Sequence, residues 1–199
     1  NRALGKLEEA IDAYNTALSI KPDYAEAYRN MGNAFQDQFK LEEAIDSYNK
    51  ALSIKLDYAE VHNSMGNALT KQGKFEEAIE AYNKALAIKP DYVEAHNSMA
   101  VALIAQGKLN EAKAYCEKAL IIEPNFADTY RNLGDALQEE GKLEEAVEAY
   151  TKALSIKPDY VDAYNNLGNA LKKWGNIQEA IEAYDKAISI KPDYVEAHN

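Results

Sequence analysis

Pairs of adjacent carboxylates are the first residues in this sequence whose types and spacing could support catalysis. Two neighbouring carboxylates can serve as a general acid and a general base. The pairs stand at equivalent places in a repeating pattern, at Glu8-Glu9, Glu42-Glu43, Glu76-Glu77 and Glu144-Glu145. Each begins an apolar stripe with helical spacing, so each falls in the first turn of a helix, where negative charge is favourable beside the helix dipole. We therefore predict a structural role for these pairs.

The histidines and the single cysteine could bind a metal or act as a nucleophile, but their spacing argues against both roles. His62, His96 and His198 stand at the same position in different repeats. Packed helices lie about 8–10 Å apart, whereas the ligands of one zinc ion lie about 2 Å from it. We predict packing roles, with His96 as the histidine that could be partly exposed and titrate. Cys116 is predicted to be a small buried hydrophobic residue.

No nucleotide or cofactor site is predicted either. Gly134 and Gly141-Lys142 have a superficial similarity to a phosphate-binding loop, but the glycine spacing is wrong and Leu143 stands where Ser or Thr is needed. The HExxH, GxSxG and CxxC patterns are absent from the sequence. We therefore predict a chain that is not an enzyme, that contains no catalytic or metal-binding residues and that needs no cofactor.

The elements that would position any functional surface belong to a repeat of 34 residues. Each repeat contains two helical patterns, which we call helix A, after a Lys-Pro-Asp-Tyr turn, and helix B, after a Gly-Lys turn. Apolar residues spaced three and four apart predict the buried face of each helix. In one copy the helix B face is Leu41, Ala44, Ile45, Tyr48, Ala51 and Leu52, and the helix A face is Tyr28, Met31, Gly32 and Phe35.

Turn residues separate the helices. Gly73 and its equivalents suit a left-handed turn after helix A, and a proline ends helix B. Phe39 replaces this glycine in one copy, and because a bulky residue is costly in that conformation, we expect a different turn shape there. Leu56 replaces one proline. An Asp three residues before an acidic residue predicts an N-terminal cap for helix A, in the pairs Asp23/Glu26, Asp57/Glu60, Asp91/Glu94, Asp159/Asp162 and Asp193/Glu196.

These residues resemble the tetratricopeptide repeat (TPR) family. The family pattern of an aromatic, Leu-Gly, Ala, an aromatic, Ala and Pro is represented by Tyr164, Leu167-Gly168, Ala180, Tyr184, Ala187 and Pro192. The resemblance covers essentially the whole chain and implies an all-α fold, an α-solenoid of antiparallel helix-turn-helix repeats forming a right-handed superhelix. Within the family, the Asn-rich A helices are most similar to the superhelical TPR arm of O-GlcNAc-transferase-like proteins.

We predict one TPR array over residues 1–199. A lone helix B spans 1–22, full repeats span 25–58, 59–92, 93–126, 127–160 and 161–194, and residues 195–199 begin a further helix A. Neither end has the polar cap that a solenoid needs, so we expect a fragment of a longer array, able to self-associate end to end through its uncapped terminal helices.

The charge balance narrows the class of partner. The sequence has 33 acidic and 22 basic residues and a net charge of −11. This composition argues against a nucleic-acid partner, which needs a basic surface. No run of residues is apolar enough for membrane insertion. One cysteine rules out an internal disulfide framework and favours a reducing, intracellular compartment, which leaves a protein or peptide ligand.

The resemblance implies that helix A lines a concave groove. Its polar face is rich in Asn, whose amide both donates and accepts hydrogen bonds and could hold the main chain of an extended peptide. Alternatively, some of these amides only tie neighbouring helices together. Two arginines could meet ligand carboxylates, and Val101 with Ile104 could form an apolar side-chain pocket or a repacked interface. The predicted peptide-binding residues are Arg29, Asn30, Asn33, Asn63, Asn67, Asn97, Val101, Ile104, Arg131, Asn132, Asn165, Asn166 and Asn169.

These observations predict a non-catalytic scaffold that binds extended peptides in an Asn-rich concave groove. Two alternatives remain: the substrate-docking arm of a larger enzyme such as a protein glycosyltransferase, or a self-associating assembly scaffold. The clamp with which some TPR domains hold the C-terminal carboxylate of heat-shock chaperones needs Asn and basic residues on three successive A helices. Glu94 and Asp135 stand where such residues would be required, so we reject that function.

Overall fold

The computed structural model describes residues 2–192. Within that range the regular secondary structure consists of α-helices alone. The A helices are about one residue shorter than the B helices in most repeats. The helices are α1 (Arg2–Ile20), α2 (Ala25–Asp37), α3 (Leu41–Ile54), α4 (Ala59–Lys71), α5 (Phe75–Ile88), α6 (Val93–Ala105), α7 (Leu109–Ile122), α8 (Ala127–Glu139), α9 (Leu143–Ile156), α10 (Val161–Trp174) and α11 (Ile177–Ile190). The even-numbered helices are the A helices, and the odd-numbered ones are the B helices.

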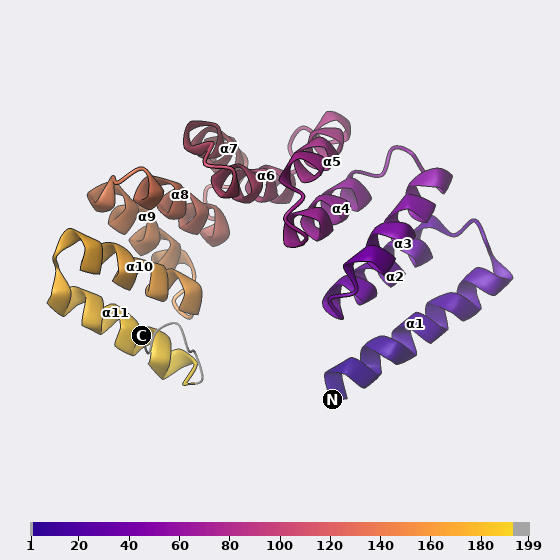
Figure 1. Ribbon diagram of the computed structural model, residues 1–199, viewed down its shortest axis with the longest axis horizontal. Helices are drawn as coiled ribbons and strands as arrows, with labels where there is room; N and C mark the ends of the chain where they lie inside the picture. Colours follow the sequence, from indigo (N-terminus) through magenta and orange to yellow (C-terminus); the bar gives the residue numbers. More distant parts are fainter. Residues whose placement is uncertain (1, 193–199) are drawn as a thin grey trace. The chain divides into compact units, whose positions relative to one another are not determined.

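The chain forms two compact units, Asn1–Ala102 and Leu103–Asn199. In unit 1, each A helix packs on the B helix that follows it, α2 on α3 and α4 on α5, while α1 packs on α2 and α3 on α4 (Figure 1). In unit 2, α8 packs on α9 and α10 on α11, while α7 packs on α8 and α9 on α10. Successive A helices also touch, α2 with α4 and α8 with α10. This is the stacking of an α-solenoid.

A tyrosine on helix B covers a glycine on helix A in each of four repeats. A Cβ atom added at Gly66 would lie 2.4 Å from the Tyr82 ring, and one at Gly32 would lie 2.5 Å from the Tyr48 ring. Gly134 with Tyr150 and Gly168 with Tyr184 repeat this geometry. The absent side chain lets a large ring lie flat against the neighbouring backbone. Helices A and B therefore approach closely where the glycine stands.

The turn after helix A is left-handed in every repeat, including the one without glycine. Gly73 has φ 75° and Gly107 has φ 71°, which confirms the prediction for the glycines. Phe39 has φ 57°, so the expectation of a different turn shape there is wrong. Its side chain is 78% exposed, so the ring itself meets no packing conflict, and the remaining cost is that of its Cβ atom in a left-handed conformation. Helix α3 still ends at Ile54 although Leu56 replaces the proline.

The predicted aspartate is not the N-cap residue in three A helices, α2, α4 and α10. The N-cap of α2 is Tyr24, that of α4 is Tyr58 and that of α10 is Tyr160, and none of the three makes a side-chain cap hydrogen bond. The helix therefore begins one residue later than the prediction assumed. The acidic residue instead lies in the first turn, as Glu26 does in α2, where it meets the positive end of the helix dipole. The pair Asp193/Glu196 and His198 lie outside the described residues.

Replacing Gly66 by Ala should destabilise the chain by about 1–3 kcal/mol, because the new methyl group overlaps the buried Tyr82 ring. Equilibrium unfolding in guanidinium chloride measures the change. Gly5→Ala is the matched control, since nothing lies within 4 Å of a Cβ at Gly5, and should stabilise helix α1 by about 0.5–1 kcal/mol. Equal effects of the two substitutions would contradict the packing argument.

Replacing Phe39 by Gly should stabilise unit 1 by about 1 kcal/mol, because glycine adopts the left-handed conformation without the steric cost that other residues pay. The gain is reduced by any contact of Lys71 with the Phe39 ring, whose centroid lies 5.7 Å from Lys71 Nζ. Hydrogen exchange of the α2 and α3 amides should slow, and Gly73→Ala should speed exchange in α4 and α5. Unchanged exchange in Phe39→Gly would show that the left-handed turn carries no strain.

Candidate functional site

The polar faces of the A helices in unit 1 surround a cavity of about 300 Å³. Residues from α2, α4 and α6 line it, and the Tyr82 hydroxyl group reaches it from α5. Its lining residues are Gln36, Asn67, Thr70, Lys71, Tyr82, Ser98 and Val101. Three successive A helices thus contribute to one hollow, which is lined mainly by side chains able to form hydrogen bonds.

Unit 2 has two cavities on the corresponding faces of its A helices. One, of about 340 Å³, is lined by Ile104, Asp135, Gln138, Glu139 and Asn166. The other, of about 330 Å³, is lined by Gln138, Asn169, Lys172 and Lys173. Because Gln138 contributes to both, the two hollows are neighbours that share one wall. A ligand that lies across α8 and α10 would meet both.

Hydrogen bonds from helix B orient the asparagines on this face. The Tyr48 hydroxyl donates to Asn33 Oδ1 at 2.8 Å, and the Tyr82 hydroxyl donates to Asn67 Oδ1 at 2.9 Å. The Tyr184 hydroxyl donates to Asn169 Oδ1 at 2.8 Å. Each bond uses the amide oxygen and leaves the Nδ2 group, with its two donors, to point away from the tyrosine. The packing of the scaffold therefore sets which end of the amide a ligand meets.

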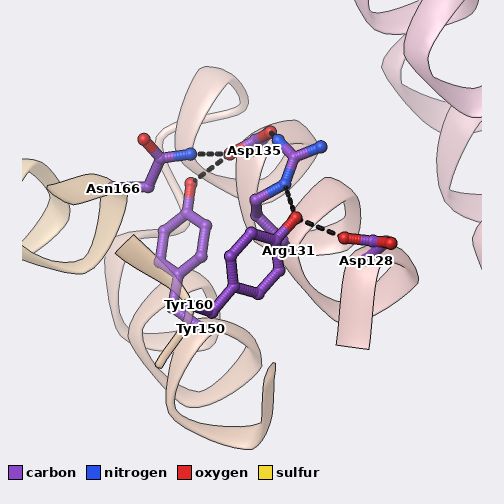
Figure 2. Close-up of polar contacts among 6 residues, drawn as sticks. All are labelled: Asp128, Arg131, Asp135, Tyr150, Tyr160 and Asn166. Atoms are coloured by element: carbon purple, nitrogen blue, oxygen red, sulfur yellow. Dashed lines mark hydrogen bonds and ion pairs between the residues drawn. The ribbon is translucent and has the colours of Figure 1, made fainter. Parts of the chain in front are cut away.

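In repeat 127–160 an aspartate takes the place of this asparagine and joins a larger network. Asp135 Oδ1 accepts hydrogen bonds from Tyr150 Oη and Asn166 Nδ2, each at 2.8 Å. Asp135 Oδ2 forms an ion pair with Arg131 at 2.6 Å. Figure 2 shows the Asp135 carboxylate between these three donors. This position therefore carries a carboxylate, paired with Arg131, where three other repeats carry an amide.

Arg131 is held on its other side by Tyr160. Arg131 Nε donates to Tyr160 Oη at 2.7 Å, and Tyr160 donates in turn to Asp128 (Figure 2). Burial lowers the pKa of Arg131, but Asp135, Tyr160 and Asp128 outweigh burial and raise it above its usual value. Burial raises the pKa of Asp135, although the Arg131 charge and the hydrogen bonds from Tyr150 and Asn166 oppose this shift. The pair is thus an internal ion pair between α8 residues one turn apart.

Three of the predicted peptide-binding amides are buried. Asn132 is 1% exposed, Asn63 is 6% exposed and Asn165 is 7% exposed. Little of these three side chains is exposed, and their part in a peptide site stays a prediction.

The two predicted arginines differ in their partners. Arg131 is neutralised by Asp135, so the structure gives it a scaffold role that the prediction of a ligand contact did not include. Arg29 donates to Asn30 Oδ1 at 3.1–3.3 Å and lies 5.7 Å from the Tyr58 ring centroid. Within residues 2–192 no carboxylate forms a salt bridge with Arg29, so its charge remains available.

The other predicted residues are divided among the hollows. Asn67 and Val101 meet in the unit 1 cavity, Ile104 and Asn166 meet in the first cavity of unit 2, and Asn169 lies in the second. Asn33 is exposed and Asn97 is partly exposed on the A helices of unit 1. Asn30 is occupied by Arg29.

Sequence reasoning missed several lining residues on the last turn of the A helices: Gln36, Thr70, Lys71, Gln138, Glu139, Lys172 and Lys173. These positions follow the Asn33-equivalents by three or four residues, so they lie on the same helical face. This spacing of three or four residues could have identified them as neighbours of the predicted asparagines. Their side-chain types change from repeat to repeat, which hid them from an argument based on recurring residues.

The histidines of the described chain pack against turns. His96 Nε2 lies 2.8 Å from the Pro90 carbonyl oxygen, and His62 Nε2 lies 3.3 Å from that of Leu56. His96 is 6% exposed, which contradicts the suggestion that it is partly exposed. Burial lowers the pKa of His62. Cys116 is fully buried, and burial raises the pKa of its thiol to about 12. Among residues 2–192 no three His, Cys, Asp or Glu side chains are grouped to hold a metal ion.

Family models match most of the chain. A model described as "TPR repeat" matches residues 2–38, 40–73, 66–107 and 134–175. Models described as "Tetratricopeptide repeat" match residues 93–126 and 161–194, and residues 115–148. A comparison with curated protein sequences finds no match. In the described part of the chain, no helix combines the length and apolar character needed to span a membrane.

Three solved structures illustrate the similarity of the fold. YrrB, described as a TPR protein with an unusual peptide-binding site, is 26% identical, with a TM-score of 0.65 over 94% of this chain and 97% of that one. MamA is 26% identical, with a TM-score of 0.67 over 86% and 95%. PilW, described as a widely conserved type IV pilus biogenesis factor, is 25% identical, with a TM-score of 0.86 over 96% and 89%.

The buried tyrosines predict a loss of stability in alkali. Burial raises the pKa of Tyr82 from 10.0 to about 12. The unfolded chain therefore ionises first, and stability that is complete below pH 10 falls as the pH rises toward 12, by up to roughly 2 kcal/mol for this residue. Urea unfolding at pH 8 and pH 11.5 should show a smaller loss for Tyr82→Phe than for the wild type. Tyr24→Phe, which changes an exposed tyrosine, is the control. Equal losses in all three chains would refute the shift.

Proposed function

Because the chain belongs to the tetratricopeptide repeat family, we propose that it binds extended peptide segments of partner proteins along its A helices. Members of this family are generally non-catalytic protein-interaction scaffolds. The cavities on the A-helix faces carry the proposal. Each is lined by side chains from more than one A helix, so a ligand that follows them must cross successive repeats.

The oriented asparagines supply the chemistry of recognition. Asn67 and Asn169 use their Oδ1 atoms to accept from Tyr82 and Tyr184. Their Nδ2 groups remain as donors at the cavities that these two residues line. Main-chain carbonyl groups of an extended peptide are acceptors that recur in any sequence, so such donors hold a peptide backbone without reading its side chains. Affinity for an extended segment follows from the repeat itself.

Each cavity adds side-chain specificity in a different way. Val101 gives the unit 1 cavity an apolar wall, whereas Asp135 gives the first cavity of unit 2 an acceptor. The likeness to YrrB, a TPR protein with a peptide-binding site, supports a peptide as the ligand. A docking arm of a larger enzyme would hold its substrate through the same contacts and is a special case of this function.

Replacing Asn67 by Asp tests the proposal while keeping the scaffold. Aspartate still accepts the Tyr82 hydrogen bond but has no donor for a peptide carbonyl. Peptides of twelve residues selected from a random display library against the wild-type chain should bind Asn67→Asp about tenfold more weakly, the effect of losing one or two hydrogen bonds. Fluorescence anisotropy with the selected peptides measures the affinity.

Asn83→Asp is the matched control, because Asn83 is exposed on α5, one residue past Tyr82 and outside the lining of the unit 1 cavity. It introduces the same charge and should leave affinity unchanged. If selection yields no peptide, or if both variants bind as the wild type does, the A-helix face is not a peptide site.

A further inference from the structure

Charged side chains with no ion-pair partner border the two cavities of unit 2, and their signs differ between the cavities. Glu139, at the end of α8, lines the first cavity. Lys172 and Lys173, in the last turn of α10, line the second. All three are exposed, and none forms a salt bridge with any residue in the range 2–192. Their charges are therefore available to a ligand.

The net charge of each cavity follows from its lining residues. In the first cavity, Asp135 is paired with Arg131 at 2.6 Å, so Glu139 supplies the unbalanced negative charge. In the second cavity, the other two lining residues, Gln138 and Asn169, are neutral, so Lys172 and Lys173 give this cavity a positive charge. The two hollows thus present one negative and two positive charges to a ligand that spans α8 and α10.

We propose that this face of unit 2 selects a peptide segment with a basic side chain and an acidic side chain about three residues apart. The basic side chain lies beside Glu139, and the acidic side chain lies beside Lys172 and Lys173. This inference rests on the proposed function and adds the chemistry of the segment. A segment with the opposite charge at either place is rejected by repulsion between like charges.

The spacing follows from the geometry of the repeat. Helices α8 and α10 touch, and the axes of packed helices lie about 8–10 Å apart. An extended chain advances about 3.3–3.6 Å per residue, so about three residues lead from one cavity to the next. Gln138, the shared wall, has a buried Oε1 atom without a hydrogen-bond partner in the described chain. Its amide can turn to accept from a main-chain N–H between the two charged residues.

The same order of charge occurs independently in unit 1. Asp37 ends α2, and Lys71, which lines the unit 1 cavity, ends α4. In both units an acidic residue on one A helix is followed by a basic residue on the next. The A helix that lies between them in the sequence, α6, ends in the neutral residues Ile104 and Ala105.

Defined peptides test the proposal on the full chain. Labelled twelve-residue peptides in an uncharged background of Ser, Thr and Val carry one Arg and one Glu, separated by different numbers of residues and in both orders. Peptides with one charge or none accompany them. We expect the tightest binder to carry both charges, and loss of either charge to weaken binding about fivefold. The preference should shrink as NaCl rises from about 0.05 M to about 0.5 M.

Charge-reversed variants assign each charge to its cavity. Glu139→Lys should abolish the preference for Arg and leave the preference for Glu. The double substitution Lys172→Glu/Lys173→Glu should do the reverse. Glu148→Lys and Lys152→Glu, at exposed positions of α9, make equal charge changes outside the cavities and should alter neither preference.

The outcomes separate the two proposals. If peptides bind and weaken in Asn67→Asp, yet bind equally with and without charges, the charge inference is overturned and the proposed function stands. If no peptide binds, both fail. If the chain dimerises in a sedimentation run, the dimer weakens in Lys172→Glu/Lys173→Glu and no peptide binds, this face is an interface between copies of the chain, which also overturns the inference.

Discussion

The contact between a helix B tyrosine and a helix A glycine is the constraint on which the rest of the repeat depends. The ring occupies the space that a side chain at Gly66 would need, so the two helices approach at one register only. The hydroxyl group of the same tyrosine donates a hydrogen bond to Asn67, the residue that follows this glycine in helix A. A single tyrosine therefore sets both the packing of the helix pair and the orientation of an amide that lines the unit 1 cavity.

Repeat 93–126 shows what happens when this tyrosine is absent. Cys116 stands at the tyrosine position, Ala100 at the glycine position and Val101 at the asparagine position. The three changes are physically linked. A small side chain in place of the ring leaves room for a Cβ on helix A, and without a hydroxyl no acceptor is needed on the next residue. A position that offers an amide elsewhere thus becomes the apolar wall of the unit 1 cavity.

The parts of this molecule that could be predicted from the sequence are those that recur. The all-helical repeat and the left-handed glycines follow from residue types that return every 34 residues. The left-handed turn at Phe39 could not be predicted from local preference, because the flanking helices impose it and the exposed ring tolerates it. Asn132 is buried, whereas Asn67 lines a cavity. The sequence could not distinguish them, because both are asparagines on the polar face of an A helix. The lining residues at the helix ends were missed because their side chains differ in each repeat.

Within each A helix, the recurring residues take part in packing, whereas the varying residues at the end of the helix line the cavities. Asn67 accepts the Tyr82 hydrogen bond through its amide oxygen and lines the unit 1 cavity, so a change at this position affects both. Asp135 also accepts a hydrogen bond from the helix B tyrosine, but its carboxylate has no N–H donor. Its negative charge is paired with Arg131, four residues earlier. Glu139 and Lys172 have no packing duty, since both are exposed at helix ends. A substitution at either position can therefore change the charge that lines a cavity without disturbing the tyrosine–glycine contact between helices A and B.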